Sequence, residues 1–120
     1  MKVSELSGEA LDRWVARAMG YAHLSAREAA FALDGQISPC VFTTSRGNLR
    51  LASADSVTAW NPSSDWACGG PIIDRERISI IERGDHWFAD TRGASEVGGS
   101  PLEAAMRAYV SREFGDEVLG

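Results

Sequence analysis

Two amphipathic helices are predicted at the two ends of the chain, and neither can bury its apolar side without another element. The first spans about residues 8–19, with Ser7 as its N-cap and Gly20 as its stop. The last spans about residues 101–114, and its start combines an N-cap, a proline at the first helical position and a capping-box glutamate in Ser100-Pro101-Leu102-Glu103. The rest of the chain must supply a surface that covers both helices.

That surface is predicted to be a small antiparallel sheet, built from a hairpin near residues 78–91. Its strands are residues 78–82 and 86–91, and Arg83-Gly84-Asp85 supplies the turn. A connection of small residues, 95–99, then leads to the last helix. The helix residues that face the sheet are Leu11, Trp14, Val15, Ala18 and Met19, followed by Leu102, Ala105, Met106, Tyr109, Val110 and Phe114. The simplest architecture is a sandwich-like α+β fold.

Between the first helix and the hairpin the pattern is weaker. Ser25-Ala26-Arg27-Glu28 reads as a capping box for a short helix that ends at Asp34-Gly35. Residues 40–44 and 49–52 alternate like strands, with a turn at 45–48. A hairpin is one interpretation of this region, and an irregular excursion is the other.

The middle of the chain carries an unusual run of residues from Trp60 to Ile73, with two tryptophans, two prolines and a Gly-Gly pair. Pro71 is predicted to open one or two helical turns that reach about Arg77. Free N–H groups there would favour an anion, and the glycines would let a ligand approach the backbone. The run is therefore either a structural loop pinned by two buried tryptophans or a ligand or partner site. The candidate site residues are Trp60, Asn61, Ser63, Asp65, Trp66, Gly69 and Gly70.

Length and charge exclude several classes of function. At 120 residues we predict one domain, 1–120, large enough for a core without metal support. The net charge of −5 disfavours nonspecific nucleic-acid binding, which needs basic residues against phosphates.

No segment has the length of a membrane span or the pattern of a signal peptide, so a cytoplasmic location is expected. Cys40 and Cys68 lack metal-site spacing and are predicted to be free thiols, with a bridge as the alternative.

The reactive side chains show no catalytic pattern. His23 has no evident partner, and His86 beside Asp85 reads as a solvated turn residue. No nucleophile elbow or Cys/His signature surrounds the middle run. The acids Asp74, Glu76 and Glu82 alternate with Arg75, Arg77 and Arg83, which predicts a solvated charged face. The tail acids Glu113, Asp116 and Glu117 are likewise expected to face solvent. We assign no catalytic residue, metal ligand or cofactor.

Three blocks of the sequence resemble one family. The first is Ser4-Glu5-Leu6-Ser7-Gly8-Glu9-Ala10-Leu11-Asp12 with Trp14-Val15-Ala16, and the second runs from Asn61-Pro62-Ser63-Ser64-Asp65-Trp66 through Gly69-Gly70-Pro71 to Glu76. The third is Ser100-Pro101-Leu102-Glu103-Ala104-Ala105-Met106-Arg107-Ala108-Tyr109-Val110 with Phe114-Gly115-Asp116-Glu117-Val118. This order resembles the NinX-like group of small phage and prophage proteins and, more distantly, phage domains described as α-β-α sandwiches. Residues 21–59 carry no part of the resemblance.

The resemblance implies a phage or prophage origin and action in the bacterial host cytoplasm. It transfers no catalytic residue, because none is established for the family, and Cys68 stands where members carry a polar residue. The first hypothesis is a non-enzymatic accessory protein that binds a host or phage protein. The alternatives are a binder of an anionic metabolite or nucleotide at residues 60–73, and an enzyme of unknown class. Self-association is compatible with each of them.

Overall fold

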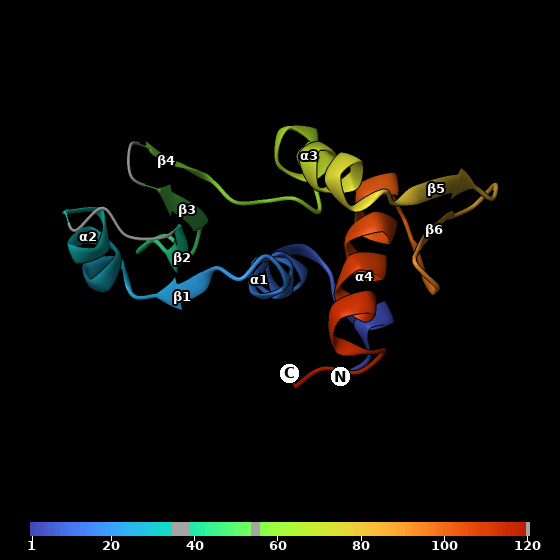
Figure 1. The fold of residues 1–120 in the computed structure, drawn as a ribbon, viewed down its shortest axis with the longest axis horizontal. Coiled ribbons are helices and arrows are strands. Elements are labelled where there is room, and N and C mark those ends of the chain that lie inside the picture. The colour runs from blue at the N-terminus through green and yellow to red at the C-terminus, as the bar shows by residue number, and fades with distance from the viewer. Residues whose placement is uncertain (35–38, 54–55, 120) are drawn as a thin grey trace.

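The computed structural model describes residues 1–34, 39–53 and 56–119. Figure 1 shows an elongated α+β arrangement, with principal extents of 46 × 27 × 24 Å. In chain order the elements are η1 Val3–Glu5, α1 Gly8–Ala18, β1 Ala22–Leu24, α2 Ala26–Asp34, β2 Cys40–Thr43, β3 Leu49–Ser53, β4 Ser56–Ala59, α3 Trp66–Glu76, β5 Ser79–Glu82, β6 Trp87–Thr91, β7 Ala94–Gly98 and α4 Pro101–Phe114. The predicted α+β class is confirmed.

The predicted hairpin forms the first two strands of a sheet in the order β5-β6-β7. β5 pairs antiparallel with β6, and Glu82 lies opposite Trp87 across the turn. The connection predicted at residues 95–99 is wrong, because Ala94–Gly98 pairs with β6 as a third strand. The turn between β6 and β7 has two residues in the left-handed region, Arg92 at φ 49° and Gly93 at φ 90°. Arginine rarely adopts this backbone conformation, so the sequence did not indicate a turn at this position.

The two predicted terminal helices are confirmed, but only α4 packs on this sheet, and α1 packs against α4 on the side away from it (Figure 1), so one sheet does not cover both helices as predicted. Their apolar residues meet in one core that includes Leu11, Val15, Met106 and Val110. Ser100 caps α4 as predicted, and its hydroxyl accepts the Glu103 N–H at 3.1 Å. Ser7 stands at the N-cap of α1 but its side chain makes no capping hydrogen bond. The main core therefore lies between α1 and α4 and holds the two helices together.

The weakly patterned region forms a second sheet in the order β1-β2-β3-β4. The capping box of α2 is confirmed by reciprocal bonds between Ser25 and Glu28. The hairpin interpretation of residues 40–52 is also confirmed, since β2 pairs antiparallel with β3. Two of its strands were not predicted, β1, which runs parallel to β2, and β4, which pairs with β3. The helix end predicted at Gly35 lies outside the described residues.

The second sheet has a small core of its own, made by Ala29, Cys40 and Ala52 with Leu24 and Phe42 against them. Val41 of β2, Leu49 of β3 and Trp60, just after β4, belong instead to the main core, and Leu51 packs on it. The segment after β4 therefore joins the two parts of the molecule. Cys40 and Cys68 form no disulfide, as predicted.

Candidate functional site

Trp60 fastens the middle of the chain to α1. Its side chain is 5% exposed, and its indole Nε1–H donates to the carbonyl oxygen of Asp12 at 2.9 Å. The carboxylate of Asp12 accepts the backbone N–H of Ser63 at 2.9 Å. The ring of Tyr21 meets the Trp60 ring edge-on, with 5.4 Å between centroids. Two of the candidate site residues, Trp60 and Ser63, are thus held by buried contacts to the first helix.

Asp12 is itself buried, with 5% of its surface exposed. Burial raises the pKa of its carboxyl above the ordinary value, and the hydrogen bond from Ser63 offsets part of that rise. An acceptor at this position is needed because the Ser63 N–H would otherwise be buried without a partner. The Asp12–Ser63 hydrogen bond therefore stabilises the conformation of the loop that follows Trp60.

The middle run is largely helical, which corrects the prediction that a helix starts at Pro71. α3 begins at Trp66, and the carboxylate of Asp65 caps it by accepting the Ala67 N–H at 2.9 Å. Pro71 lies inside this helix and has no N–H to offer the Ala67 carbonyl. The expected anion site at a Pro71 helix start is therefore wrong, because the helix begins five residues earlier and a carboxylate already occupies its N-cap.

Gly69 and Gly70 have different surroundings in α3. A Cβ on Gly69 would lie 2.4 Å from the Pro62 carbonyl oxygen and 2.6 Å from Leu102 Cδ2. A Cβ on Gly70 would meet only Trp66, at 3.9 Å. The absence of a side chain at Gly69 lets α3 approach the loop and α4, so this glycine is explained by packing.

The two tryptophans of the run also differ, so the alternative of a loop pinned by two buried tryptophans holds for Trp60 and is wrong for Trp66. Trp66 stands at the start of α3 with 55% of its surface exposed. Asn61 accepts backbone N–H groups of Ser64 and Asp65 at its carbonyl oxygen, at 3.0 and 2.9 Å. Because more than half of the Trp66 side chain is exposed, packing does not explain why a tryptophan stands at this position.

Clefts lie on both sides of Trp60. A polar cleft of about 410 Å³ is lined by Gly8, Glu9, Asp12, Gly47, Asn48, Leu49, Arg50, Ala59, Trp60, Asn61 and Ser64. Its described lining contains one cationic residue, Arg50, and two acidic residues, Glu9 and Asp12. The candidate residues Trp60 and Asn61 therefore border an open concavity as well as the core.

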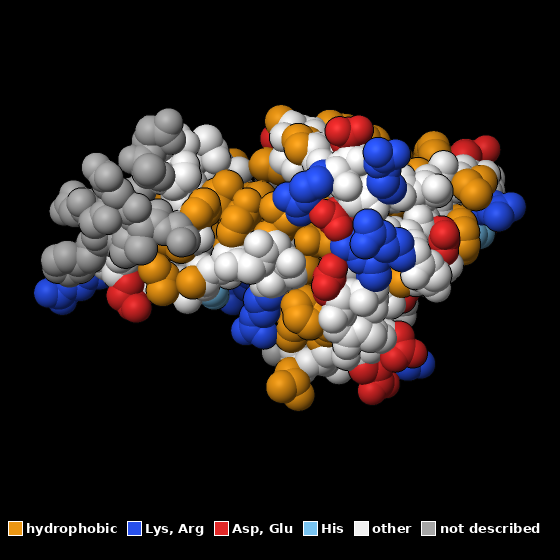
Figure 2. All heavy atoms as spheres, viewed as in Figure 1, with side chains coloured by type: hydrophobic (Ala, Val, Ile, Leu, Met, Phe, Trp, Pro, Cys, Tyr) orange, Lys and Arg blue, Asp and Glu red, His pale blue; other side chains and the backbone are white. Residues whose placement is uncertain are grey.

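The second cleft, which we call the apolar cleft, has a volume of about 310 Å³. It is lined by Met19, Tyr21, Leu51, Thr58, Ala59, Trp60, Ala67, Cys68, Pro71, Ile72 and Arg75. Its walls come from the second sheet on one side and α3 on the other. The Cys68 Sγ lies 3.3 Å from the Ala59 carbonyl oxygen and links these walls. Figure 2 shows apolar side chains gathered in the middle of the molecule, next to the charged groups over α3 and α4.

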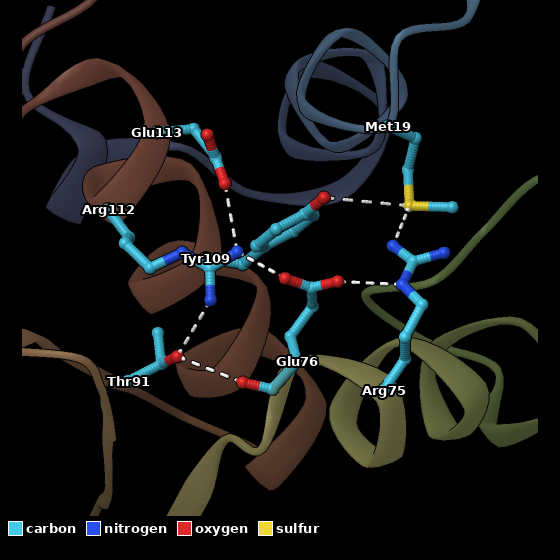
Figure 3. A network of polar contacts seen from close by, with 7 residues as sticks. All are labelled: Met19, Arg75, Glu76, Thr91, Tyr109, Arg112 and Glu113. Carbon is cyan, nitrogen blue, oxygen red and sulfur yellow. Dashed lines mark hydrogen bonds and ion pairs between the residues drawn. The ribbon is translucent and has the colours of Figure 1, made fainter.

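Glu76 lies in a polar network instead of the predicted solvated face (Figure 3). Its carboxylate receives the Arg75 Nε–H at 2.6 Å and pairs with Arg112 of α4. Arg112 also donates to Thr91 Oγ1 at 3.1 Å and to Glu113 at 2.8 Å. Hydrogen bonds from Arg112 and Arg75 hold the pKa of Glu76 below its ordinary value.

The same network reaches α1 and the apolar cleft. The Arg75 Nη2 lies 2.7 Å from the Met19 sulfur, which the Tyr109 hydroxyl also approaches, at 3.6 Å. The network clamps α3 to α4, β6 and α1, and it fixes one wall of the apolar cleft. Sequence reasoning missed it because Glu76 and Arg112 are far apart in the chain.

The remaining reactive groups do not converge on one place. His86 lies exposed in the turn, as predicted, and its Nδ1 is 2.7 Å from Asp85 Oδ1. His23 lies in the other sheet, with its Nε2 3.4 Å from Thr43 Oγ1. Within residues 1–34, 39–53 and 56–119, no group of three or more His, Cys, Asp or Glu side chains could hold a metal ion. In the same ranges, no helix has the length and apolar content to cross a bilayer.

One comparison with known proteins places the chain. The family model described as "Bacteriophage P22, NinX" matches residues 2–113. The match covers the first two blocks of the resemblance and the third as far as residue 113. It also covers residues 21–59. No curated protein matches the chain significantly.

Proposed function

The chain belongs to the phage NinX family, and from that premise we propose that it is an accessory protein that binds another protein of the phage or of its bacterial host. The proposed place of action is the host cytoplasm. Binding does not require convergent catalytic groups, and it does require an apolar surface that water can reach.

The apolar cleft and the exposed Trp66, which stands on another face of α3, carry this proposal. The cleft is open, and its accessible apolar lining includes Leu51, Ala59 and Pro71, with the buried Trp60 and Ile72 behind them. Trp66 begins α3 and lies against Gly70, so it adds a second exposed apolar surface on this helix, outside the cleft. Tryptophan is enriched among residues that dominate protein interfaces, because it buries a large rigid surface. A rigid wall and an exposed anchor on one helix suit a protein partner.

Crosslinking in infected cells tests the proposal. The tagged chain is expressed during phage infection, crosslinked and purified, and its partners are identified by mass spectrometry. Trp66→Ala should weaken the recovered complex about thirtyfold, which corresponds to the roughly 2 kcal/mol of an interface hot spot. The matched control is Ile81→Ala, since Ile81 is also exposed but lies on β5.

The proposal predicts that Ile81→Ala leaves recovery unchanged. Recovery of no specific partner, or equal loss from both variants, would contradict it. Circular dichroism of each purified variant separates loss of binding from loss of fold.

A small ligand is the second candidate, and the polar cleft favours it. That cleft is larger, at about 410 Å³, and it offers Arg50, Asn48 and Asn61 as polar contacts. A thermal-shift screen against nucleotides and phosphorylated metabolites tests this candidate. A ligand at one hundred times its dissociation constant should add about 2.7 kcal/mol of stability, and Arg50→Ala should remove the gain. A screen without hits would exclude the classes tested.

A further inference from the structure

We propose that the apolar cleft binds an extended segment of the partner, which adds to β4 as a fifth strand and inserts an apolar side chain between β4 and α3. This inference rests on the proposed function and names the kind of segment that is bound. Strand addition to a sheet edge is an established mode of peptide recognition, in which the backbone supplies affinity and alternate side chains supply specificity.

β4 is the terminal strand of its sheet, and all four of its residues are exposed. The Trp60 N–H donates to the Leu49 carbonyl at 3.0 Å, which makes residues 49 and 60 a hydrogen-bonded pair. Such pairs alternate along an antiparallel ladder, so Thr58 with Leu51 is the next one. The backbone groups of Val57 and Ala59 therefore face away from β3, toward the outer edge.

The contact between Cys68 and Ala59 agrees with this alternation, because the Ala59 carbonyl points toward α3. The N–H and C=O of Val57 and the N–H of Ala59 then form the outer row of the edge. Residues i and i+2 of an added strand match this spacing.

The composition of β4 leaves this edge receptive. Natural proteins block exposed edges with charged residues, proline or bulges. The sequence Ser56-Val57-Thr58-Ala59 has no charge and no proline, and Val57 is 49% exposed. An added strand would cover that side chain as well as the backbone.

The apolar cleft lies directly beside this edge, since Thr58 and Ala59 of β4 line it. Ala67 and Pro71 line the opposite wall, and the missing N–H of Pro71 leaves the Ala67 carbonyl as an acceptor there. A strand on β4 would thus place side chains over Leu51 and Trp60.

Charge selects the kind of segment. Among the described residues that line the apolar cleft, Arg75 is the charged one, and its side chain is 53% exposed. An aspartate or glutamate near the inserted apolar residue would pair with it. β4 of a second copy contains no carboxylate, so two copies paired through β4 would bring no acid to the exposed part of the Arg75 guanidinium, whose Nε–H already donates to Glu76. The occupant we infer is a partner segment that alternates apolar residues with an acidic one.

A displayed library of random ten-residue peptides provides the test. The full chain is the bait, and selected peptides are synthesised and measured by fluorescence anisotropy. The sequences should share an apolar residue and a nearby acid. Methylation of single backbone nitrogens in the peptide should weaken binding about tenfold at alternate positions only, because only every second N–H of an added strand faces β4. This readout leaves the protein unchanged.

Val57→Pro tests the protein side, since it removes the outward N–H without removing a donor to β3. The control is Val57→Thr, which keeps the N–H and the branched side chain. Binding should fall about tenfold for the first and stay within twofold for the second. Arg75→Gln should abolish the preference for the acidic residue. Retained hydrogen-exchange protection at the Thr58 amide shows that the sheet is intact.

Methylation without alternation, or equal binding by Val57→Pro and wild type, would overturn the inference. Concentration-dependent dimers that Val57→Pro disrupts would also overturn it, because a second copy would then cover the edge. If Trp66→Ala weakens the complex in infected cells and Val57→Pro does not, the proposed function stands and strand addition fails. If no partner is captured and no peptide is selected, both fail.

Discussion

Gly69 and Gly70 are neighbours in the sequence with opposite tolerances for a side chain. Gly69→Ala should lower the free energy of unfolding by about 1–3 kcal/mol, because its Cβ would overlap the Pro62 carbonyl and Leu102. Gly70→Ala should raise it by about 0.5–1 kcal/mol, since alanine favours the helix and the position is open. Urea unfolding of both variants measures the difference. Equal effects would contradict the close approach of α3 to the loop.

Asp12 gives a second prediction at this scale. Asp12→Ala should cost about 1–3 kcal/mol, because the buried Ser63 N–H loses its acceptor. Asp12→Asn keeps an acceptor without a buried charge, so at pH 7 it should be as stable as wild type or more stable. The raised pKa of Asp12 means that its neutral form favours folding, and this contribution is lost as pH rises through the folded-state pKa.

Thermal unfolding from pH 3 to pH 8 checks this order. The advantage of Asp12→Asn should be largest at neutral pH and should vanish below the ordinary Asp pKa of 3.8. An advantage that grew toward acid pH would show that Asp12 acts through its charge.

At the scale of elements, the Glu76–Arg112 pair clamps α3 to α4. Glu76→Gln should lower stability by about 1–2 kcal/mol at pH 7, because Arg112 and Arg75 lose their charged partner. Since the pKa of Glu76 is lowered by folding, the contribution is present above 4.5 and is lost as pH falls through the folded-state pKa.

Unfolding of wild type and Glu76→Gln across pH 3–7 measures that difference. The two curves should converge toward acid pH. Asp74→Asn is the matched control on the same helix, because Asp74 is exposed, and it should change stability by less than about 0.5 kcal/mol.

α3 shows why an element of clear type could be missed. Glycine costs a helix about 1 kcal/mol and an internal proline more, so Gly69, Gly70 and Pro71 read as a loop. The Asp65 cap and the burial of Ile72 in the main core override those costs. The signal that could have located the helix start is Asp65, read as an N-cap instead of a loop residue.

At the scale of the whole molecule, the two sheets have unequal cores. The main core joins α1, α3, α4 and the β5-β6-β7 sheet and also takes in Val41 of β2 and Leu49 of β3, whereas the small core includes, among the described side chains, Ala29, Cys40 and Ala52. Amide hydrogen exchange should be faster in β4, whose four residues are all exposed, than in β6 and α4. Equal protection would indicate one cooperative unit, and that result would support the single domain predicted for residues 1–120.

The sequence by itself determined the two terminal helices, the hairpin of β5 and β6, the α+β class and the family. These depend on caps, turns and apolar periods that lie within a few residues of one another. Only the tertiary structure decided that Trp60 joins α1 through Asp12, that Glu76 meets Arg112, and that β4 borders an apolar cleft. Those contacts link residues far apart in the chain. The residues on either side of a position do not indicate which distant side chain will contact it after folding.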